Sequence, residues 1–167
     1  MQQAFAGVRI VDFTQVLSGP FAVMQLGLLG AEVIKIEQPG TGDQTRALMT
    51  DTDNGMSPSF MTCNLNKRSL TLDLKSAAAA VIIDRLIKTA DVVVENFKAG
   101  TMSRLGFGYE RLRQIKPDLI YCAVSGYGQT GARAGVAAYD GAIQAASGMM
   151  SQTGHPETGP TRTGYMQ

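Results

Sequence analysis

Polar and cationic side chains gather in this sequence just after the segments that are predicted to be strands. The clearest group follows the apolar residues 92–94, where a polar turn and a short predicted helix carry Asn96, Lys98 and Arg104. In an open α/β sheet, ligands bind outside the carboxyl ends of the strands, where such turns gather. The guanidinium of Arg104 presents a fork of donors that matches phosphate oxygens, and Lys98 adds a point charge beside it. This group predicts a site for an anionic ligand.

The same arrangement recurs at the other predicted strand ends. The further polar residues in such positions are Gln15, Ser18, Gln38, Lys75, Ser125, Tyr127 and Gln129. Each of them alone is more often a solvated surface residue than a ligand contact. Taken together, they describe one crevice along the edge of a sheet.

Several other kinds of site do not fit the sequence. The turn after the first predicted strand holds Ser18, Gly19 and Pro20 instead of the G-x-G-x-x-G fingerprint, and Pro20 lacks a backbone donor that a pyrophosphate would need. A P-loop is missing as well. His155 is the only histidine and lies in a Gly/Pro loop, where an exposed position is the simplest interpretation. We therefore expect no metal site and neither a Ser-His nor a Cys-His catalytic pair.

The composition bounds the kind of protein. The 167 residues suffice for one domain with a sizeable core. The formal net charge of +1, from 15 basic and 14 acidic residues, argues against a nucleic-acid or membrane partner and requires any bound anion to be held locally. The short apolar runs and the N-terminal residues predict neither a transmembrane helix nor a secretory signal. With only Cys63 and Cys122, a disulfide framework is not expected, and we interpret the chain as a reduced, cytoplasmic protein.

Hydrophobic periodicity and turn residues divide the chain into alternating strands and helices. The predicted strands are residues 8–13, 32–37, 69–74, 92–94 and 119–125, and the predicted helices begin at Ser18 or cover residues 57–64, 76–89, the segment around Arg104, 109–115 and 139–150. Ser18 should cap the first helix, whose Phe21, Met24 and Leu28 are spaced to bury one face. Residues 69–74 alternate between apolar and polar, which predicts an edge strand that is apolar on one side.

These elements predict an α/β fold, a Rossmann-like open and mostly parallel sheet with helices on both faces, because nearly all-apolar strands alternate with helix-length segments. Residues 38–56 should form a long loop that carries Arg46, and residues 126–138 are too rich in glycine for regular structure. Residues 151–167 have loop composition throughout. Because no closing element follows, we expect a domain that is truncated at the C-terminus.

Five stretches of the chain resemble the class III CoA-transferases, a family that includes formyl-CoA transferase, carnitine CoA-transferase and the α-methylacyl-CoA racemases. In chain order they read VDFTQVLSGPFAVMQLGLLGAEVIKIEQP, NKRSLTLDLKS, ADVVVENFKAGTMSRLGFGY, SGYGQTG and YDGAIQAASG. The resemblance covers essentially the whole chain, in the family's order and spacing. It implies that residues 1–167 are the N-terminal part of the family's large CoA-binding α/β domain.

The resemblance implies coenzyme A or acyl-CoA as the substrate, and no metal. By resemblance, the CoA contacts are Leu17, Ser18, Gln38, Leu72, Asp73, Leu74, Lys75, Asn96, Phe97, Lys98, Arg104, Ala137, Tyr139 and Asp140. These positions overlap the crevice that the strand ends predict. Gln38 stands where some members carry an arginine and Ala137 where some carry a lysine, and Arg133 and Lys98 are candidates to compensate.

The activity that the resemblance implies is the transfer of CoA between carboxylic acids. In the family an aspartate attacks the acyl-CoA thioester and forms an anhydride, and then an enzyme thioester. A carboxylate suits this role because it is both nucleophile and leaving group at a carbonyl. The family's aspartate follows the P-T-R-x-G segment by a few residues, so we expect it just beyond Gln167 and assign no catalytic residue within the chain.

Two alternatives stay open. In the racemases a histidine stands at the position of Tyr139 and acts as a base, whereas a phenol titrates near pH ~10, which favours a transferase. The other alternative is a non-catalytic CoA-binding module. The resemblance further implies small-molecule partners, an acyl-CoA and a carboxylic acid, and a homodimer of interlocked full-length chains, with the 167 residues inactive on their own.

Overall fold

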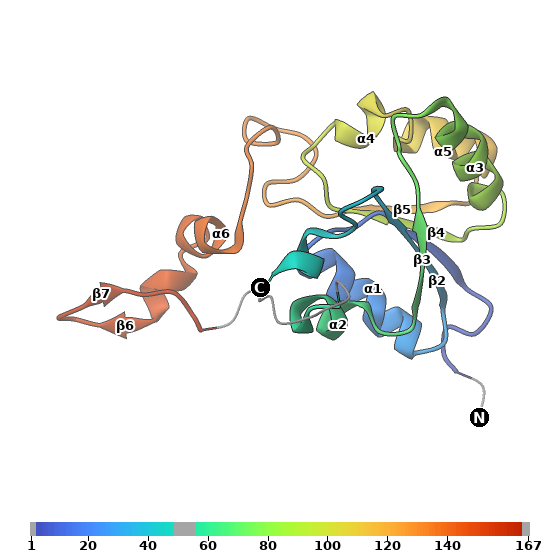
Figure 1. Cartoon of the computed structure of the whole chain (residues 1–167). Helices are drawn as coiled ribbons and strands as arrows, with labels where there is room; N and C mark the ends of the chain where they lie inside the picture. The colour runs from blue at the N-terminus through green and yellow to red at the C-terminus, as the bar shows by residue number, and fades with distance from the viewer. Residues whose placement is uncertain (1–2, 49–55, 165–167) are drawn as a thin grey trace.

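The computed structural model describes residues 3–48 and 56–164, so part of the predicted loop 38–56 and the terminal Gln167 lie outside the described residues. Its centre is a five-stranded sheet in the order β3-β2-β1-β4-β5, in which every neighbouring pair is parallel (Figure 1). The strands are β1 (Arg9–Asp12), β2 (Glu32–Glu37), β3 (Lys67–Thr71), β4 (Val92–Glu95) and β5 (Ile120–Ala123). The predicted α/β fold with a mostly parallel sheet is confirmed.

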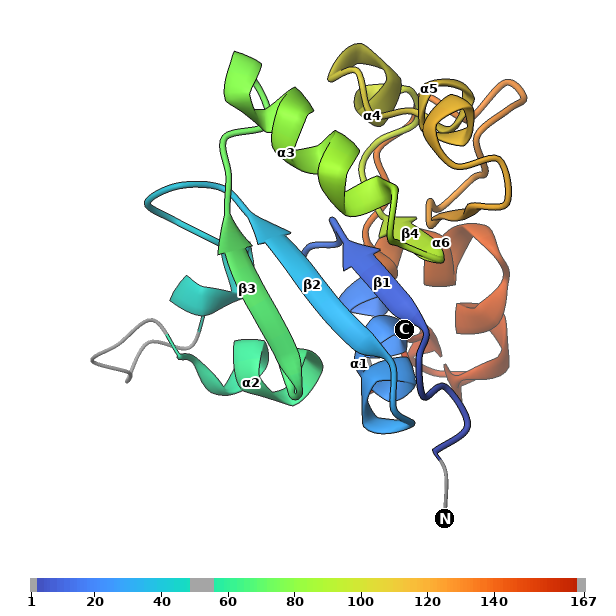
Figure 2. The ribbon, with the colours of Figure 1, turned by 90° about the vertical axis from the view of Figure 1, so that its right-hand side faces the viewer.

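Helices cover both faces of the sheet, as predicted. On one face lie α1 (Ser18–Leu28) and α2 (Pro58–Asn64), and on the other lie α3 (Ala77–Ile87), α4 (Thr101–Arg104) and α5 (Tyr109–Ile115) (Figure 2). The chain leaves β1 toward β2 on one side and returns to β4 on the other. This reversal of strand order places a topological switch point at the carboxyl ends of β1 and β4, where α/β sheets bind ligands.

The core has two layers because successive strand residues face opposite sides of the sheet. On β1, Val11 joins the cluster of Ile83 and Leu112 beneath α3 and α5, whereas Ile10 joins the cluster of Val23 beneath α1. All five side chains are buried. The strands are therefore fixed in register from both faces, which holds the loops at their carboxyl ends in place.

The helix α1 packs differently from the sequence-based expectation. Ser18 is the first helical residue and does not cap it, and Phe21 and Leu28, which were expected to be buried, are 51% and 46% exposed. The buried face contains Gly27, where an added Cβ would lie 3.3 Å from Cγ2 of Val33. Met24 is buried, as predicted. The small Gly27 permits a close approach of the helix to the sheet, and Phe21 and Leu28 lie on its exposed side.

The third strand also differs from its predicted bounds. It covers Lys67–Thr71, whereas residues 72–75 leave the ladder in a turn in which Oδ1 of Asp73 accepts the N–H of Lys75 at 2.9 Å. The edge position and the apolar side are confirmed. Leu72 is buried, and Leu70 and Leu74 pack against the same core cluster.

The last part of the chain extends away from the sheet (Figure 1). It contains α6 (Asp140–Ala146), η2 (Met149–Gln152) and an antiparallel hairpin of β6 (Gly154–His155) and β7 (Gly159–Pro160). The predicted helix 139–150 is wrong in its second half because Gly148 adopts a left-handed φ of 80°. The loop expected throughout residues 151–167 is wrong as well, since the hairpin lies within it. The remaining 3-10 helix is η1 (Gln44–Ala47).

Candidate functional site

Among the hollows that lie where loops follow the carboxyl ends of the strands, three together contain every residue that the family resemblance assigns to CoA. The loop hollow is lined by Leu17, Ser18, Asn96, Phe97, Lys98, Ala137, Tyr139 and Asp140, the central hollow by Gln38, Leu72, Asp73, Leu74, Lys75 and Phe97, and the cationic hollow by Leu74, Lys75 and Arg104, together with further residues in each. Every residue that the family resemblance assigns to CoA therefore lines at least one hollow. Their contact with a ligand stays a prediction.

The hollows share walls and form a series. Phe97 lines both the loop hollow and the central hollow, and Lys75 lines both the central hollow and the cationic hollow. In this series Asn96 and Arg104 do not line the same hollow. Asn96 lines the loop hollow and Arg104 the cationic hollow, with the central hollow between them. Only an extended ligand would reach both residues.

The turn after β1 is fixed to the end of β4 by one side chain. Oδ1 of Asn96 accepts the N–H of Gln15 at 2.8 Å, and Nδ2 of Asn96 donates to the carbonyl of Gln15 at 2.7 Å. Asn96 was predicted as a ligand contact on account of its amide. In the structure that amide holds the main chain of Gln15, so a positioning role is the one that its hydrogen bonds support directly.

Buried polar groups hold the flanking residues of the same turn. Asp12 accepts the N–H of Thr14 at 2.8 Å, and Nζ of Lys35 donates to the carbonyl of Thr14 at 2.7 Å. The N–H of Val16 donates to Oδ1 of Asp43 at 3.3 Å. Val16 has a φ of 70°, which a β-branched residue adopts only where its surroundings impose it. The turn is thus rigidly placed beside the hollows.

Two ion pairs beneath the turn are almost fully buried. Lys35 and Asp43 approach to 2.9 Å, with side chains 1% and 0% exposed, and Lys67 and Asp12 approach to 2.9 Å, with 2% and 0% exposed. Burial acts to raise the pKa of Asp43, but the charge and hydrogen bond of Lys35 and the hydrogen bonds of Thr45 lower it below its usual value. Burial lowers the pKa of Lys67 in spite of Asp12.

Neighbouring donors and a positive charge stabilise the ionised form of Glu37, a buried carboxylate beside the central hollow. Although burial raises the pKa of Glu37, hydrogen bonds from Arg46, Ser69 and the N–H of Asp43, with the charge of Arg46, lower it to about 2. Arg46 donates to both carboxylate oxygens, at 2.7 and 2.8 Å, and lies 3.7 Å over the ring of Phe60. Arg46, predicted in a loop, is therefore part of the structural frame.

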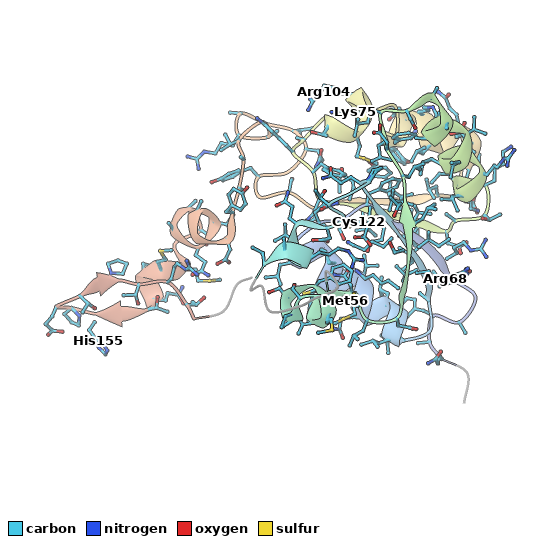
Figure 3. All side chains as sticks on the ribbon, in the orientation of Figure 1. Met56, Arg68, Lys75, Arg104, Cys122 and His155 are labelled. Atoms are coloured by element: carbon cyan, nitrogen blue, oxygen red, sulfur yellow. The ribbon has the colours of Figure 1, made fainter. Side chains whose placement is uncertain are left out.

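The cationic hollow gathers positive side chains at one end of the series. Lys75 and Arg104 lie at the same end of the sheet (Figure 3), and neither forms an ion pair within residues 3–48 and 56–164. Arg104 donates to Oγ1 of Thr101 at 2.8 Å. Arg111 also lines this hollow, but Nη2 of Arg111 binds both oxygens of Asp84, at 2.7 and 2.9 Å. Uncompensated cations around a hollow suit phosphate groups.

The loop hollow has one wall made by residues 134 and 136–140. That wall packs on Gly126, where an added Cβ would clash with Cβ of Ala138 and approach Cδ1 of Ile143 to 2.8 Å. Lys98, a candidate to compensate for the cations that some family members carry at the positions of Gln38 and Ala137, lines this hollow. Arg133 does not line any of the three hollows. Its guanidinium lies 5.7 Å from the centre of the ring of Tyr127.

The other polar residues predicted at the strand ends differ in where they lie. Ser125 lines the loop hollow, whereas Tyr127 and Gln129 line none of the three hollows. Cys63 is buried and Cys122 exposed, and both are free thiols. Across residues 3–48 and 56–164, the structure holds no cluster of side chains suited to a metal ion. None of the helices in that part of the chain is long and apolar enough to span a bilayer.

Two residues that line the hollows were not predicted from the sequence. Gln44 lines both the central and the loop hollow, and Arg111 lines the cationic hollow. Gln44 lies in the segment 38–56, which the sequence indicates only as a long loop. Arg111 is one of several charged residues on a short helix. No pattern in the sequence distinguishes either residue from a solvated side chain, because their positions depend on how distant loops pack.

Comparison with known proteins identifies related sequences. The family model described as CoA-transferase family III matches residues 5–166. The chain is 46% identical over 158 residues to succinyl-CoA:glutarate CoA-transferase of Mus musculus, covering 95% of this chain and 36% of the relative. It is 47% identical over 161 residues to acetyl-CoA:oxalate CoA-transferase of Acetobacter aceti, covering 96% of this chain and 41% of the relative.

Solved structures give the same picture for the fold. A CAIB/BAIF family protein from Brucella suis matches with a TM-score of 0.92 and 38% identity, covering 99% of this chain and 45% of that one. Rv3272 from M. tuberculosis matches with a TM-score of 0.88 and 37% identity, covering 98% and 45%. The chain thus spans less than half the length of these proteins.

Proposed function

Since the chain belongs to CoA-transferase family III, we propose that its three hollows bind coenzyme A or acyl-CoA for an enzyme that moves CoA between carboxylic acids. The observation that carries the proposal is the coincidence of two independent sets. The residues assigned to CoA by resemblance are scattered from Leu17 to Asp140, and all of them line one series of hollows at the ligand-binding edge of the sheet.

The charges suggest how CoA lies in the site. Its phosphates belong in the cationic hollow, beside Lys75 and Arg104, because those cations have no carboxylate partner in the described residues and guanidinium matches phosphate oxygens. The thiol end then extends through the central hollow into the loop hollow. The curated relatives are named for transfers between acyl-CoA and dicarboxylates, which supports a carboxylic acid as the acceptor.

The proposed transfer needs a carboxylate nucleophile, and we assign none among the described residues. Asp140 is the carboxylate of the loop hollow, but it accepts hydrogen bonds from Nε2 of Gln144 at 2.9 and 3.1 Å, which favours a structural role. Tyr139 is 78% exposed beside it, where a racemase would need a base. For the whole protein we further propose that it forms a homodimer and that it is located in the cytoplasm.

Titration calorimetry with CoA and with dephospho-CoA tests the binding proposal. We expect saturable CoA binding, and weaker binding of dephospho-CoA because it offers the cationic hollow fewer phosphate oxygens. A transfer assay with succinyl-CoA and a dicarboxylate acceptor, run on the whole protein because the 167 residues are expected to be inactive alone, separates an enzyme from a binding module, which would bind CoA without turnover. Absence of CoA binding would contradict both functions.

A further inference from the structure

Two glutamine residues lie at the passage between the loop hollow and the central hollow. Gln15 and Gln44 each line both hollows, and Phe97 is the third residue that does so. Gln15 lies in the loop that follows β1, and Gln44 is the first residue of η1, in the connection that follows β2. A ligand that occupies both hollows must pass these three residues.

The main chains that carry the two glutamines are fixed to each other and to the sheet. The N–H of Val16, next to Gln15, donates to Oδ1 of Asp43, next to Gln44. Asp43 is held in turn by the buried Lys35, and its N–H donates to the carboxylate of Glu37 at 2.9 Å. The main chain beside both glutamines is therefore fixed, while their side-chain amides are left to meet a ligand.

The side chains of the glutamines make no hydrogen bond with the described residues. The hydrogen bonds of Gln15 all involve its main chain, and the side chain of Gln44 makes no hydrogen bond within residues 3–48 and 56–164. Each amide therefore has a donor and an acceptor available at the passage. Such a pair suits a chain that carries amide groups of its own, because amide pairs satisfy both functions at once.

We propose that Gln15 and Gln44 bind the amide groups of the pantetheine arm of CoA. This inference rests on the proposed function and adds two contacts that the family resemblance does not assign. If the phosphates lie by Lys75 and Arg104, the part of CoA that crosses from the central to the loop hollow is the pantetheine arm. Phe97, a partly buried apolar residue that lines both hollows, suits the methylene groups between the amides.

The test replaces both glutamines by methionine, which keeps the length of the side chain and removes its polar atoms. Calorimetry then compares CoA with 3′-phospho-ADP, the nucleotide part of CoA that lacks the arm. For Gln15→Met/Gln44→Met we expect CoA to bind roughly tenfold more weakly, since each hydrogen bond contributes a few-fold. Binding of 3′-phospho-ADP should not change. The unfolding midpoint should also stay the same, because the amides make no internal hydrogen bond.

The matched control is Gln114→Met. Gln114 is exposed on α5 and lines none of the three hollows, so this substitution should leave the binding of both ligands unchanged. Equal CoA binding by the double variant and the wild type overturns the inference and leaves the proposed function standing. Equal losses for CoA and 3′-phospho-ADP, or a lower unfolding midpoint, also overturn it. If the wild type binds neither ligand, the proposed function fails and the inference fails with it.

Discussion

Asn96 holds Gln15 through both polar atoms of its side-chain amide, across 81 positions of sequence, with contacts of 2.8 and 2.7 Å. The two residues follow neighbouring parallel strands, β4 and β1, and the contact joins the loops on either side of the topological switch point. Because Gln15 lines two hollows, this amide holds one side of the passage between them in place.

Replacing Asn96 by alanine should therefore act on both stability and binding. Loss of the two hydrogen bonds leaves main-chain groups of Gln15 without partners, which costs about 1–3 kcal/mol of unfolding free energy. Urea unfolding measures this loss, and CoA titration should show weaker binding as the turn relaxes. Asn96→Asp retains an acceptor for the N–H of Gln15, so it should lose less stability. An Asn96→Ala protein as stable as the wild type would contradict the positioning role.

The buried pair of Lys35 and Asp43 should be among the most sensitive positions of the chain. Lys35→Met leaves Asp43 as an unpaired buried charge, and we expect a loss of about 3–5 kcal/mol. The exposed pair of Arg68 and Glu32, at 3.2 Å with side chains 78% and 37% exposed, serves as the control, and Arg68→Ala should cost less than about 1 kcal/mol. Equal effects of the two substitutions in urea unfolding would refute this ranking.

Stability should depend on acidic pH through Glu37. A carboxyl group whose pKa is lower in the folded state stabilises the fold above its usual pKa, and this contribution is lost as the pH falls through the folded value. For Glu37 the window runs from 4.5 down to about 2. The unfolding free energy should fall across this window in the wild type. Glu37→Gln should show a smaller fall, and identical slopes for the two proteins would contradict the assignment.

The loop hollow should depend on the absence of a side chain at Gly126. In Gly126→Ala the new Cβ would meet Ala138 and Ile143, so the wall of the hollow must move and CoA binding should weaken. Gly135→Ala is the control, because nothing lies within 4 Å of its Cβ position. We expect it to bind CoA like the wild type. Equal CoA affinity of the two variants would show that this wall does not contact the ligand.

The sequence predicts the sheet well because its signals are local. The apolar run 92–94 lies in β4 as expected, although Glu95, which was expected in the following turn, still belongs to the strand. The parallel order follows from alternating strands and helices. The packing of α1 could not be predicted, since periodicity favours Phe21 and Leu28 as core residues, whereas Gly27 provides the close contact with β2. Helix periodicity reports apolar residues and not the shape of the surface they meet.

The sequence predicts which residues line the site better than it predicts what their side chains bind. The residues assigned to CoA do line one series of hollows, but the amide of Asn96 binds Gln15, and Arg104 lies in a different hollow. The buried state of Lys67 was not foreseen either, because a lysine before an edge strand usually faces solvent. These facts depend on contacts between distant loops, for which the sequence offers no local signal.

A crystal structure with bound CoA would show directly where the cofactor lies. We expect phosphate oxygens within hydrogen-bond distance of Lys75 and Arg104, the pantetheine arm between Gln15 and Gln44, and the thiol in the loop hollow beside Tyr139. CoA bound on another face of the molecule, or with its phosphates in the loop hollow, would refute the proposed site.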